Sequence, residues 1–207
     1  MKLPEKTIER LSQYRRTLLN CLTKGQTHIY SHELAALLNI TAVQVRRDIM
    51  FLGYTSIQRK GYDIKELVEV IGTLLDHNEV INVAVVGIGH LGTAITAYFK
   101  GKRAKLDIVA AFDIDQNKIG RVIAGVKCFA ISQINDVIKS MNISIGIITV
   151  PPENASEVAE KLVISGIKGI LNLTTVPLNV SVHVYLEEYD MVTSLEKVAY
   201  FVKKQKG

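Results

Sequence analysis

The sequence has no long hydrophobic run and only two cysteines. No stretch of about 18 apolar residues occurs, which excludes a membrane-spanning helix and predicts no membrane partner. The first residues, MKLPEKTIERLSQYRR, are charged and lack the apolar centre of a signal peptide. Cys21 and Cys128 lie far apart, in no metal-binding or redox spacing. We therefore expect a cytoplasmic protein with reduced, buried cysteines, and a disulfide or a redox-active thiol is the alternative.

Positive charge is concentrated in the first third of the chain. Residues 1–65 carry eleven lysines and arginines against five acidic residues, whereas the remaining residues carry fourteen against fifteen. A basic module joined to a near-neutral one favours a polyanion as the partner of the first module. A solvated basic surface without such a partner is the alternative.

Two kinds of pattern meet near residue 78. Residues 4–75 have the pattern of helices with short breaks and one brief charged hairpin. From Val80 onward, apolar runs typical of strands alternate with helical patterns. This alternation predicts βαβ units and a parallel sheet that helices cover on both faces. The polar segment LLDHNEVIN predicts a domain boundary between the two parts.

The segment NVAVVGIGHLGTAI, residues 82–95, contains the pattern G-x-G-x-x-G at Gly87, Gly89 and Gly92. It follows an apolar run and opens a helical pattern, which is the context of a dinucleotide-binding loop. The first glycine makes a tight turn, the second lets the backbone approach a pyrophosphate, and the third lets helix and strand pack closely. The helix N-terminus offers its N–H groups to the phosphates. The predicted site includes His90 and Leu91, which lie inside the loop.

An acidic residue ends the next apolar run, LDIVAAFDID. Asp113 lies twenty-one residues after Gly92, the spacing of the acid that accepts hydrogen bonds from the adenosine ribose. A carboxylate there repels a 2′-phosphate and favours NAD(H) over NADP(H), although the nearby Lys118 weighs against this preference. Asp115 is the alternative acid. Coenzyme A is the main alternative ligand, and a Rossmann-like domain with a degenerate site is the other.

The sequence shows no evident motif for a catalytic or metal site. The five histidines show no metal-ligand spacing, and no Tyr-x-x-x-Lys or His–Asp constellation stands out. A dehydrogenase needs a substrate domain or a proton donor aimed at the nicotinamide, and few residues remain after the predicted sheet. We therefore expect a sensor and not an enzyme, with neither a catalytic residue nor a metal site.

The segment YSHELAALLNITAVQVRRDIMFLG predicts a helix-turn-helix. Ser31 can cap a first helix over residues 32–38, and Thr41 can cap a second, with Gln44 completing a capping box. In the second helix, Val45, Ile49 and Leu52 recur at helical spacing and are expected to face the core.

Polar side chains on the same helix are then left pointing outward. Gln44, Arg46 and Arg47 are therefore candidates for DNA contacts, because glutamine suits adenine and arginine suits guanine in a major groove. An ordinary solvated basic helix face is the alternative. Arg59 and Lys60, before Gly61, are expected at a hairpin tip that resembles the wing of a winged helix and contacts phosphates.

Together these residues resemble the Rex family of redox-sensing transcriptional repressors over nearly the whole chain. The shared motifs are QVRRD, GYDI, VVGIGHLGTA, AFDID, TVP at 149–151, GIKGILN at 166–172 and YFV near the end. The resemblance implies a homodimer that binds palindromic double-stranded operator DNA and releases it when NADH binds, so that it senses the NADH/NAD⁺ ratio. It also implies that the C-terminal helix swaps onto the partner subunit.

The resemblance assigns further residues by position. Thr149, Val150 and Pro151 are expected to line the nicotinamide side of the site, with Tyr98 nearby. Arg16 and Asp190 match residues that the family pairs between the N-terminal module and the sensing part of the dimer.

Three positions depart from the family's usual pattern. His90 stands where the loop commonly has Asn, and LGY replaces FGE after the second helix of the motif. The wing segment IQRKGYDI lacks the first glycine of the family's usual wing and has its charges shifted. Operator sequence or affinity is therefore expected to differ from the family's usual one.

The predicted fold is α/β in three parts. Residues 1–78 are expected to form a winged helix-turn-helix domain, residues 79–190 a Rossmann parallel-sheet domain, and residues 191–207 a dimerisation helix. Leu195, Val198 and Val202 lie on the apolar stripe of that helix. The alternative functions are a small NAD-dependent oxidoreductase with a basic extension and a coenzyme A-binding module.

Overall fold

The computed structural model describes residues 3–55, 61–76, 79–101 and 105–204. The chain forms two compact units, Met1–Asn78 and Glu79–Gly207, and each has a hydrophobic core of its own. In the described part of the chain, no helix has both the length and the apolar character needed to cross a membrane.

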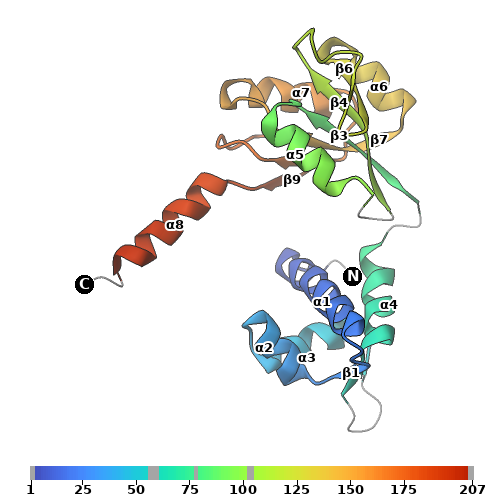
Figure 1. The fold of residues 1–207 in the computed structure, drawn as a ribbon, viewed down its shortest axis with the longest axis vertical. Coiled ribbons are helices and arrows are strands. Elements are labelled where there is room, and N and C mark those ends of the chain that lie inside the picture. The colour runs from blue at the N-terminus through green and yellow to red at the C-terminus, as the bar shows by residue number, and fades with distance from the viewer. Residues whose placement is uncertain (1–2, 56–60, 77–78, 102–104, 205–207) are drawn as a thin grey trace. The chain divides into compact units, whose positions relative to one another are not determined.

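Among its described residues, the N-terminal unit has four helices and a small two-stranded sheet, arranged as in Figure 1. Strands β1 and β2 pair antiparallel, with His28 opposite Asp63, although two helices lie between them in the sequence. In order, the elements are α1 (Glu5–Thr23), β1 (His28–Ile29), α2 (Ser31–Leu38), α3 (Ala42–Phe51), β2 (Tyr62–Asp63) and α4 (Ile64–Leu75). This order is that of a winged helix.

The apolar positions of helix α1 lie on one face, and this face is buried in the core of the unit. Leu11, Tyr14 and Leu18 are fully shielded from solvent and recur at spacings of three and four residues. They pack with Leu67 and Ile71 of α4 in one cluster. Each fully buried side chain of this kind contributes roughly 1.5–3 kcal/mol to folding.

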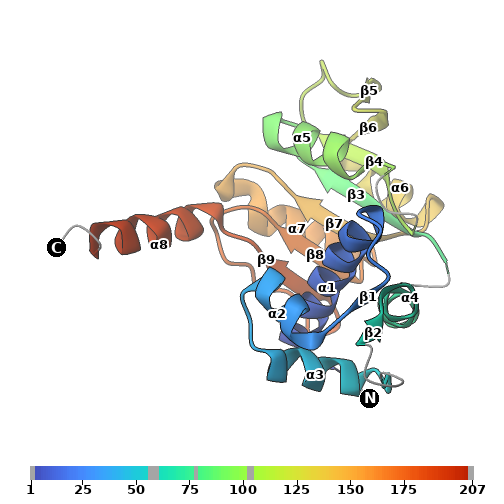
Figure 2. The ribbon, with the colours of Figure 1, turned by 60° about the horizontal axis from the view of Figure 1, so that its bottom comes forward.

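A short turn joins α2 and α3 (Figure 2). Asn39 ends α2 in the left-handed conformation, and the Thr41 hydroxyl accepts a hydrogen bond from the Gln44 backbone N–H at 3.1 Å, as predicted. The predicted cap of α2, Ser31, is instead the first residue of that helix. Tyr30 takes the cap position because the Glu33 carboxylate accepts a hydrogen bond from its backbone N–H at 2.7 Å.

The C-terminal unit is built on a seven-stranded sheet in the order β5-β6-β4-β3-β7-β8-β9. All strand pairs are parallel except β5 with β6. The six parallel strands follow the Rossmann order 3-2-1-4-5-6. The strands are β3 (Ile81–Val86), β4 (Leu106–Asp113), β5 (Val122–Ile123), β6 (Val126–Ala130), β7 (Ile143–Ile148), β8 (Gly169–Asn172) and β9 (Tyr185–Glu188).

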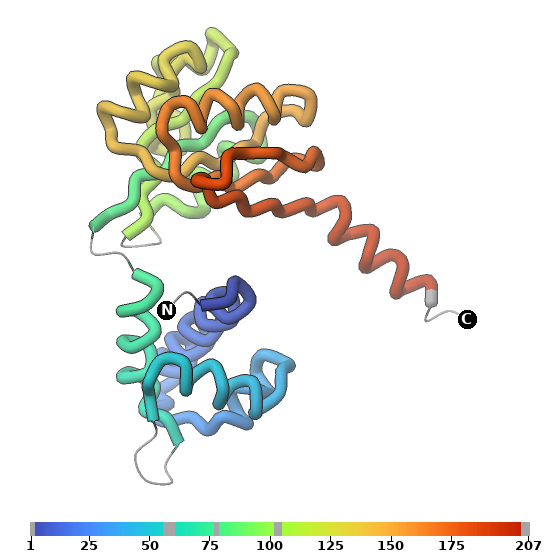
Figure 3. The backbone as a smooth tube through the Cα atoms, turned by 180° about the vertical axis from the view of Figure 1, so that it is seen from behind, coloured from blue at the N-terminus to red at the C-terminus, as the bar shows by residue number. Residues whose placement is uncertain are grey.

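Helices cover the two faces of this sheet unequally. Ala84 and Val86 of β3 pack on the side of α6 and α7, whereas Val83 and Val85 belong to the cluster on the side of α5. Figure 3 shows α6 and α7, in yellow and orange, on the opposite side from α5. The helical elements are α5 (His90–Phe99), η1 (Ile131–Gln133), α6 (Ile134–Ser140), η2 (Pro152–Asn154), α7 (Ala155–Ile164) and α8 (Met191–Lys204).

Helix α8 does not cover the sheet of its own chain. Every residue from Met191 to Lys203 is exposed, including the apolar Leu195, Val198 and Val202. The helix follows β9 and extends away from the sheet (Figure 1).

Candidate functional site

A cleft of about 330 Å³ opens at the carboxyl ends of β3, β4 and β7. Strand β3 lies between β4 and β7, so this is the point where the strand order reverses and where α/β sheets bind ligands. Of the predicted nucleotide-site residues, six line the cleft, namely Gly87, Gly89, Asp113, Thr149, Val150 and Pro151.

The three glycines of the loop have three different surroundings. Gly87 has φ of 92°, and a Cβ there would lie 2.8 Å from Cγ1 of Val150. A Cβ on Gly92 would overlap the carbonyl oxygen of Gly87, so close packing of α5 requires glycine. Gly89 has φ of −76°, and a Cβ there would enter open space. These surroundings fit a loop that turns tightly, leaves its middle open to a pyrophosphate and brings the α5 N-terminus close.

Substituting Gly89 and Gly92 separately should distinguish ligand space from packing. Gly89→Ala should leave the unfolding temperature unchanged and weaken NADH binding, because its methyl group enters the space that a pyrophosphate would take. Gly92→Ala should lower both the unfolding temperature and the affinity for NADH, since overpacking of this kind destabilises the fold by roughly 1–3 kcal/mol. Thermal unfolding and NADH fluorescence titration test both variants. Unchanged NADH affinity in Gly89→Ala would place the pyrophosphate elsewhere.

Asp113 ends β4 with its side chain only 10% exposed. Its Oδ1 accepts hydrogen bonds from the backbone N–H groups of Ile114 at 2.8 Å and Asp115 at 2.9 Å, and its Oδ2 accepts one from Nζ of Lys118 at 3.0 Å. Burial by itself raises the pKa of Asp113, but these donors together lower it below its ordinary value. The carboxylate is therefore ionised at neutral pH, and its Oδ2 keeps a lone pair for a ribose hydroxyl.

The segment after β7 forms the opposite wall of the cleft. The Thr149 hydroxyl lies 3.0 Å from the carbonyl oxygen of Val86 and 2.8 Å from that of Gly87, which ties this wall to the glycine loop. Val150 and Pro151 also line the cleft and leave an apolar surface beside the loop.

Helix α7 and the turn before it supply lining residues that the sequence analysis missed. Asn154, Glu157, Val158 and Lys161 all face the cleft, and Nζ of Lys161 lies 2.6 Å from Oε1 of Glu157. Their positions follow the i, i+3, i+4, i+7 spacing of one helix face, which is the signal that could have found them.

Four predicted residues do not line the cleft. Gly92 packs beneath the loop, whereas His90 and Leu91 begin α5. Tyr98 lies nearly two turns further along α5, with 60% of its surface exposed and its ring against Phe99. Within one chain the helix therefore carries Tyr98 away from the predicted nicotinamide side.

The predicted DNA-reading residues of α3 differ in their surroundings. Arg47 is exposed, with its guanidinium carbon 5.9 Å from the ring centre of Phe51, and Arg46 donates a hydrogen bond to the Ser31 hydroxyl at 3.1 Å. Gln44, expected to point outward, is half-buried, because its amide nitrogen donates to Asp48 at 2.9 Å. Arg59 and Lys60 lie outside the described residues.

Arg16 and Asp190 belong to different units of the chain. Arg16 is exposed on α1. Asp190 precedes α8, and its carboxylate accepts hydrogen bonds from the Thr193 hydroxyl at 2.6 Å and the Val192 backbone N–H at 2.8 Å. These hydrogen bonds lower the pKa of Asp190, and the bond from the Thr193 hydroxyl has the largest effect. Asp190 thus starts α8, and its pairing with Arg16 across a dimer stays a prediction.

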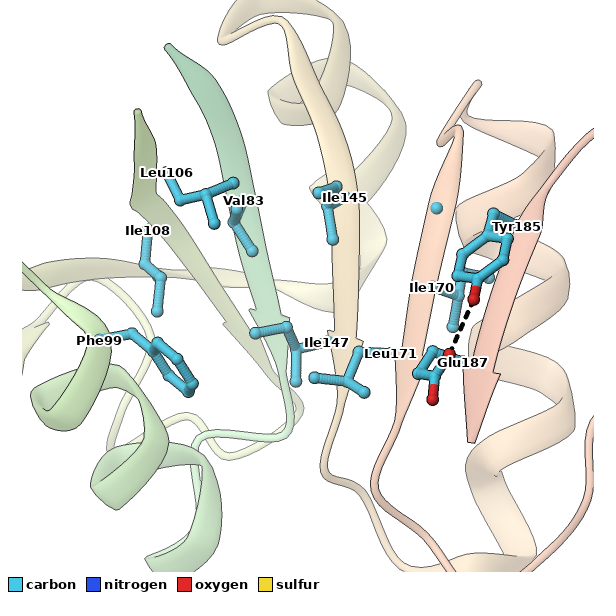
Figure 4. Close-up of a pocket in the computed structure, with 11 residues that line it drawn as sticks. Val83, Phe99, Leu106, Ile108, Ile145, Ile147, Ile170, Leu171, Tyr185 and Glu187 are labelled. Carbon is cyan, nitrogen blue, oxygen red and sulfur yellow. Dashed lines mark hydrogen bonds between the residues drawn. The ribbon is translucent and has the colours of Figure 1, made fainter. Parts of the chain in front are cut away.

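A second, apolar cavity of about 320 Å³ lies on the face of the sheet that carries α5 (Figure 4). Phe99 of α5 borders it on one side, and the Tyr185 hydroxyl, bonded to Glu187 at 2.9 Å, borders it on the other. Between them, Ile145, Ile147 and Leu171 form an apolar floor.

A winged-helix unit joined to a Rossmann unit with a nucleotide-type cleft defines the class of ligand-responsive DNA-binding regulators. Among the described residues, no group of histidine, cysteine or acidic side chains could hold a metal ion. Residues 2–49 match the family described as "Putative DNA-binding protein N-terminus", and residues 78–176 match "CoA binding domain".

Known proteins match nearly the whole chain. The redox-sensing transcriptional repressors Rex of Leuconostoc citreum and Carboxydothermus hydrogenoformans are 36% and 37% identical to it. These alignments cover 97% and 98% of this chain and 93% and 98% of theirs. Crystal structures of RSP, a Rex-family repressor, with β-NAD⁺ and operator DNA and with β-NADH are 30% identical, with TM-scores of 0.91 and 0.88. They cover all of this chain, which covers 95% and 97% of theirs. The chain belongs to the Rex family of redox-sensing transcriptional repressors.

Proposed function

We propose that this chain is a repressor that binds operator DNA through α3 and releases it when NADH binds at the glycine-loop cleft. The observation that carries the proposal is that one chain holds both an exposed Arg47 on the second helix of a helix-turn-helix and an ionised Asp113 at the strand-order reversal. One related RSP structure contains β-NAD⁺ and operator DNA and another contains β-NADH, which supports both the DNA-binding part and the NADH-binding part of the proposal.

The residues of the cleft fit a dinucleotide. Asp113 would accept hydrogen bonds from the adenosine ribose, the open side of Gly89 and the α5 N-terminus would hold the pyrophosphate, and Thr149, Val150 and Pro151 would border the nicotinamide. NAD⁺ and NADH differ in charge and planarity only at the nicotinamide. The contacts that distinguish them therefore belong to Thr149–Pro151 and not to Asp113.

The function is regulatory and not enzymatic, since the curated relatives are named as repressors. A small NAD-dependent oxidoreductase would instead turn over NADH with a substrate and ignore DNA. A coenzyme A sensor, the alternative that the match to the coenzyme A-binding family keeps in view, would bind acyl-CoA more tightly than NADH.

Release of DNA requires two arrangements of a dimer, of which only one fits the operator. Two α3 helices must lie about 34–36 Å apart, or a multiple of that, to enter successive major grooves. NADH shifts the equilibrium only through a higher affinity for the other arrangement. A coupling of about 1–3 kcal/mol would change DNA affinity roughly 5–150-fold.

The dimer forms through α8, which we assign to the apolar cavity of the partner subunit. Leu195, Val198 and Val202 are exposed in the single chain, and the apolar floor over β7 and β8 is not covered by α8 of the same chain. The two apolar surfaces complement each other, and the swapped helix that the resemblance implies agrees with this assignment. A homodimer of this kind has palindromic DNA as its natural target.

Placing a charge on the apolar stripe of α8 should break the dimer. Leu195→Asp should shift the protein to monomers in analytical ultracentrifugation and weaken operator binding, because a buried unpaired carboxylate is strongly destabilising. Lys197→Asp also adds a negative charge on α8 but lies off the stripe, and it should leave the dimer intact. A Leu195→Asp protein that remains dimeric would place the interface elsewhere.

Fluorescence anisotropy tests the function directly. The purified protein is titrated onto a labelled duplex from its own upstream region at fixed salt, because phosphate contacts make affinity salt-dependent. We expect tight binding alone and with NAD⁺, and release with NADH. Release by acyl-CoA and not NADH would support the coenzyme A alternative. Binding indifferent to every nucleotide would contradict the proposed switch.

A further inference from the structure

Asp48 is a fully buried charged residue on α3, the helix that carries Gln44 and Arg47. Its side chain has no exposed surface and faces α1. A charge in this position is unfavourable unless every oxygen is hydrogen-bonded. The hydrogen-bond donors around Asp48 therefore determine how this carboxylate is kept ionised and which side chains it orients.

Four donors surround the carboxylate. Arg10 of α1 contacts both oxygens, with Nε 2.6 Å from Oδ2 and Nη2 2.8 Å from Oδ1. The Tyr14 hydroxyl donates to Oδ2 at 2.7 Å, and the Gln44 amide nitrogen donates to Oδ1 at 2.9 Å. Each oxygen thus accepts two hydrogen bonds, which is the full capacity of a carboxylate.

These contacts hold Asp48 in its ionised form. Burial by itself raises the pKa of Asp48, but the hydrogen bonds from Arg10, Tyr14 and Gln44 together lower it below the ordinary value. An ionised carboxylate only accepts hydrogen bonds, so the Gln44 amide must turn its nitrogen toward Asp48. The chemistry of the neighbour therefore decides the orientation of an amide that is otherwise free to flip.

The fixed orientation limits what Gln44 can offer to a base. One of its two amide hydrogens is bonded to Asp48, so its oxygen and one hydrogen remain. Adenine and cytosine present an amino group in the major groove, whereas guanine and thymine present acceptors there. The oxygen matches the amino group, and the remaining hydrogen matches the acceptor N7 of adenine. In this orientation the oxygen opposes the carbonyl oxygen that guanine or thymine places where adenine or cytosine places its amino group.

We propose that Asp48 is a positioning residue that sets base preference through Gln44, selecting adenine or cytosine against guanine or thymine at one position of each half-site. The proposal rests on the proposed function, because it requires that α3 enter the major groove. Arg10 and Tyr14 support it from α1 by holding the carboxylate in place.

Base preference is the measurement that separates this role from a structural one. Every base pair of one half-site is varied in turn, and the affinity of each duplex is measured by competition anisotropy. The wild-type protein should prefer adenine or cytosine at one position by roughly 5–150-fold, the discrimination expected of one good base contact. Gln44→Ala should remove the preference at that position and leave the others unchanged.

Asp48→Asn then tests the link between the two residues. An asparagine can donate as well as accept, so the Gln44 amide is free to turn, and the preference should fall below about twofold or reverse. In a Gln44→Ala background, Asp48→Asn should change nothing further at that position, because residues that act through one another are not additive. Unchanged NADH affinity and a cooperative thermal transition check that both units are folded.

The outcomes distinguish this inference from the proposed function. A wild-type protein that binds no duplex contradicts both. A protein that binds, with no preference that Gln44→Ala removes, contradicts the role of Gln44 alone, even if Asp48→Asn fails to fold. Equal loss of affinity at every position in a folded Asp48→Asn protein, with the preference retained, would make Asp48 a structural residue and overturn the inference.

Discussion

Arg47→Ala is expected to weaken operator binding by at least ~30-fold while leaving NADH affinity unchanged. An arginine that donates to both acceptors of a guanine contributes about 1–3 kcal/mol, and a dimer on a palindrome loses two such contacts. Arg47 is exposed near the middle of α3, and its guanidinium carbon lies 5.9 Å from the centre of the Phe51 ring. A cation–π contact of this exposed kind is worth about 0.5–1 kcal/mol, so the side chain can leave it for a base.

Anisotropy titrations at several salt concentrations measure this loss, and Lys24→Ala is the matched control. Lys24 is an exposed cation of the same unit that lies after α1 and not on α3. Its removal should change affinity only slightly and equally for all duplexes. Arg47→Ala should instead relax specificity at one base pair. A parallel loss of DNA and NADH affinity in Arg47→Ala would contradict the separation into a DNA-reading unit and a sensing unit.

The elements whose sequence pattern is local were predictable. Strands β3, β4, β7 and β8 lie inside the sheet, so each is an apolar run that the sequence displays directly. The glycine loop and Asp113 follow from spacing within one βαβ unit. Strand β9, in contrast, has no such signal, since three of its four residues are exposed at the sheet edge and no apolar alternation marks it.

The side-chain partners were less predictable, because they join distant parts of the chain. Helical spacing correctly places Val45 and Ile49 in the core, but it cannot tell that Asp48 beside them meets Arg10, 38 residues earlier. For the same reason, helical spacing cannot show that the Gln44 side chain, expected to be free to point outward, is held by Asp48, and its contact with DNA stays a prediction. The sequence shows Lys118 only as a neighbour of Asp113, whereas the structure gives it a direct ion pair at 3.0 Å.

The second large effect that we expect is the loss of nucleotide affinity in Asp113→Ala, which also removes this ion pair with Lys118. The variant should bind both NADH and NAD⁺ roughly 10–150-fold more weakly, because hydrogen bonds to a charged group contribute about 1.5–3 kcal/mol. The loss should be equal for the two nucleotides, since the proposed contact of Asp113 is with the adenosine half that they share. Isothermal titration calorimetry with each nucleotide measures it.

Asp107→Ala is the matched control, because Asp107 is an exposed acid on the same strand, β4. It should leave both affinities unchanged. Unchanged NADH affinity in Asp113→Ala would mean that another residue, with Asp115 the first candidate, binds the ribose. A loss for one nucleotide alone would mean that Asp113 lies beside the nicotinamide and that the proposed orientation in the cleft is reversed.

The same variant should narrow the preference for NADH over NADPH. In the wild-type protein, Lys118 is paired with Asp113 at 3.0 Å and lies 3.8 Å from Asp115, so its charge is largely compensated. Removing Asp113 removes the carboxylate that is expected to repel a 2′-phosphate. It also takes the nearer acidic partner from Lys118, whose side chain is 32% exposed and which lines the cleft. NADPH affinity should therefore fall less than NADH affinity, or rise. A Lys118→Ala, Asp113→Ala double variant should bind NADPH more weakly than Asp113→Ala alone. This result would identify Lys118 as the group that binds the 2′-phosphate and Asp113 as the residue that normally compensates its charge.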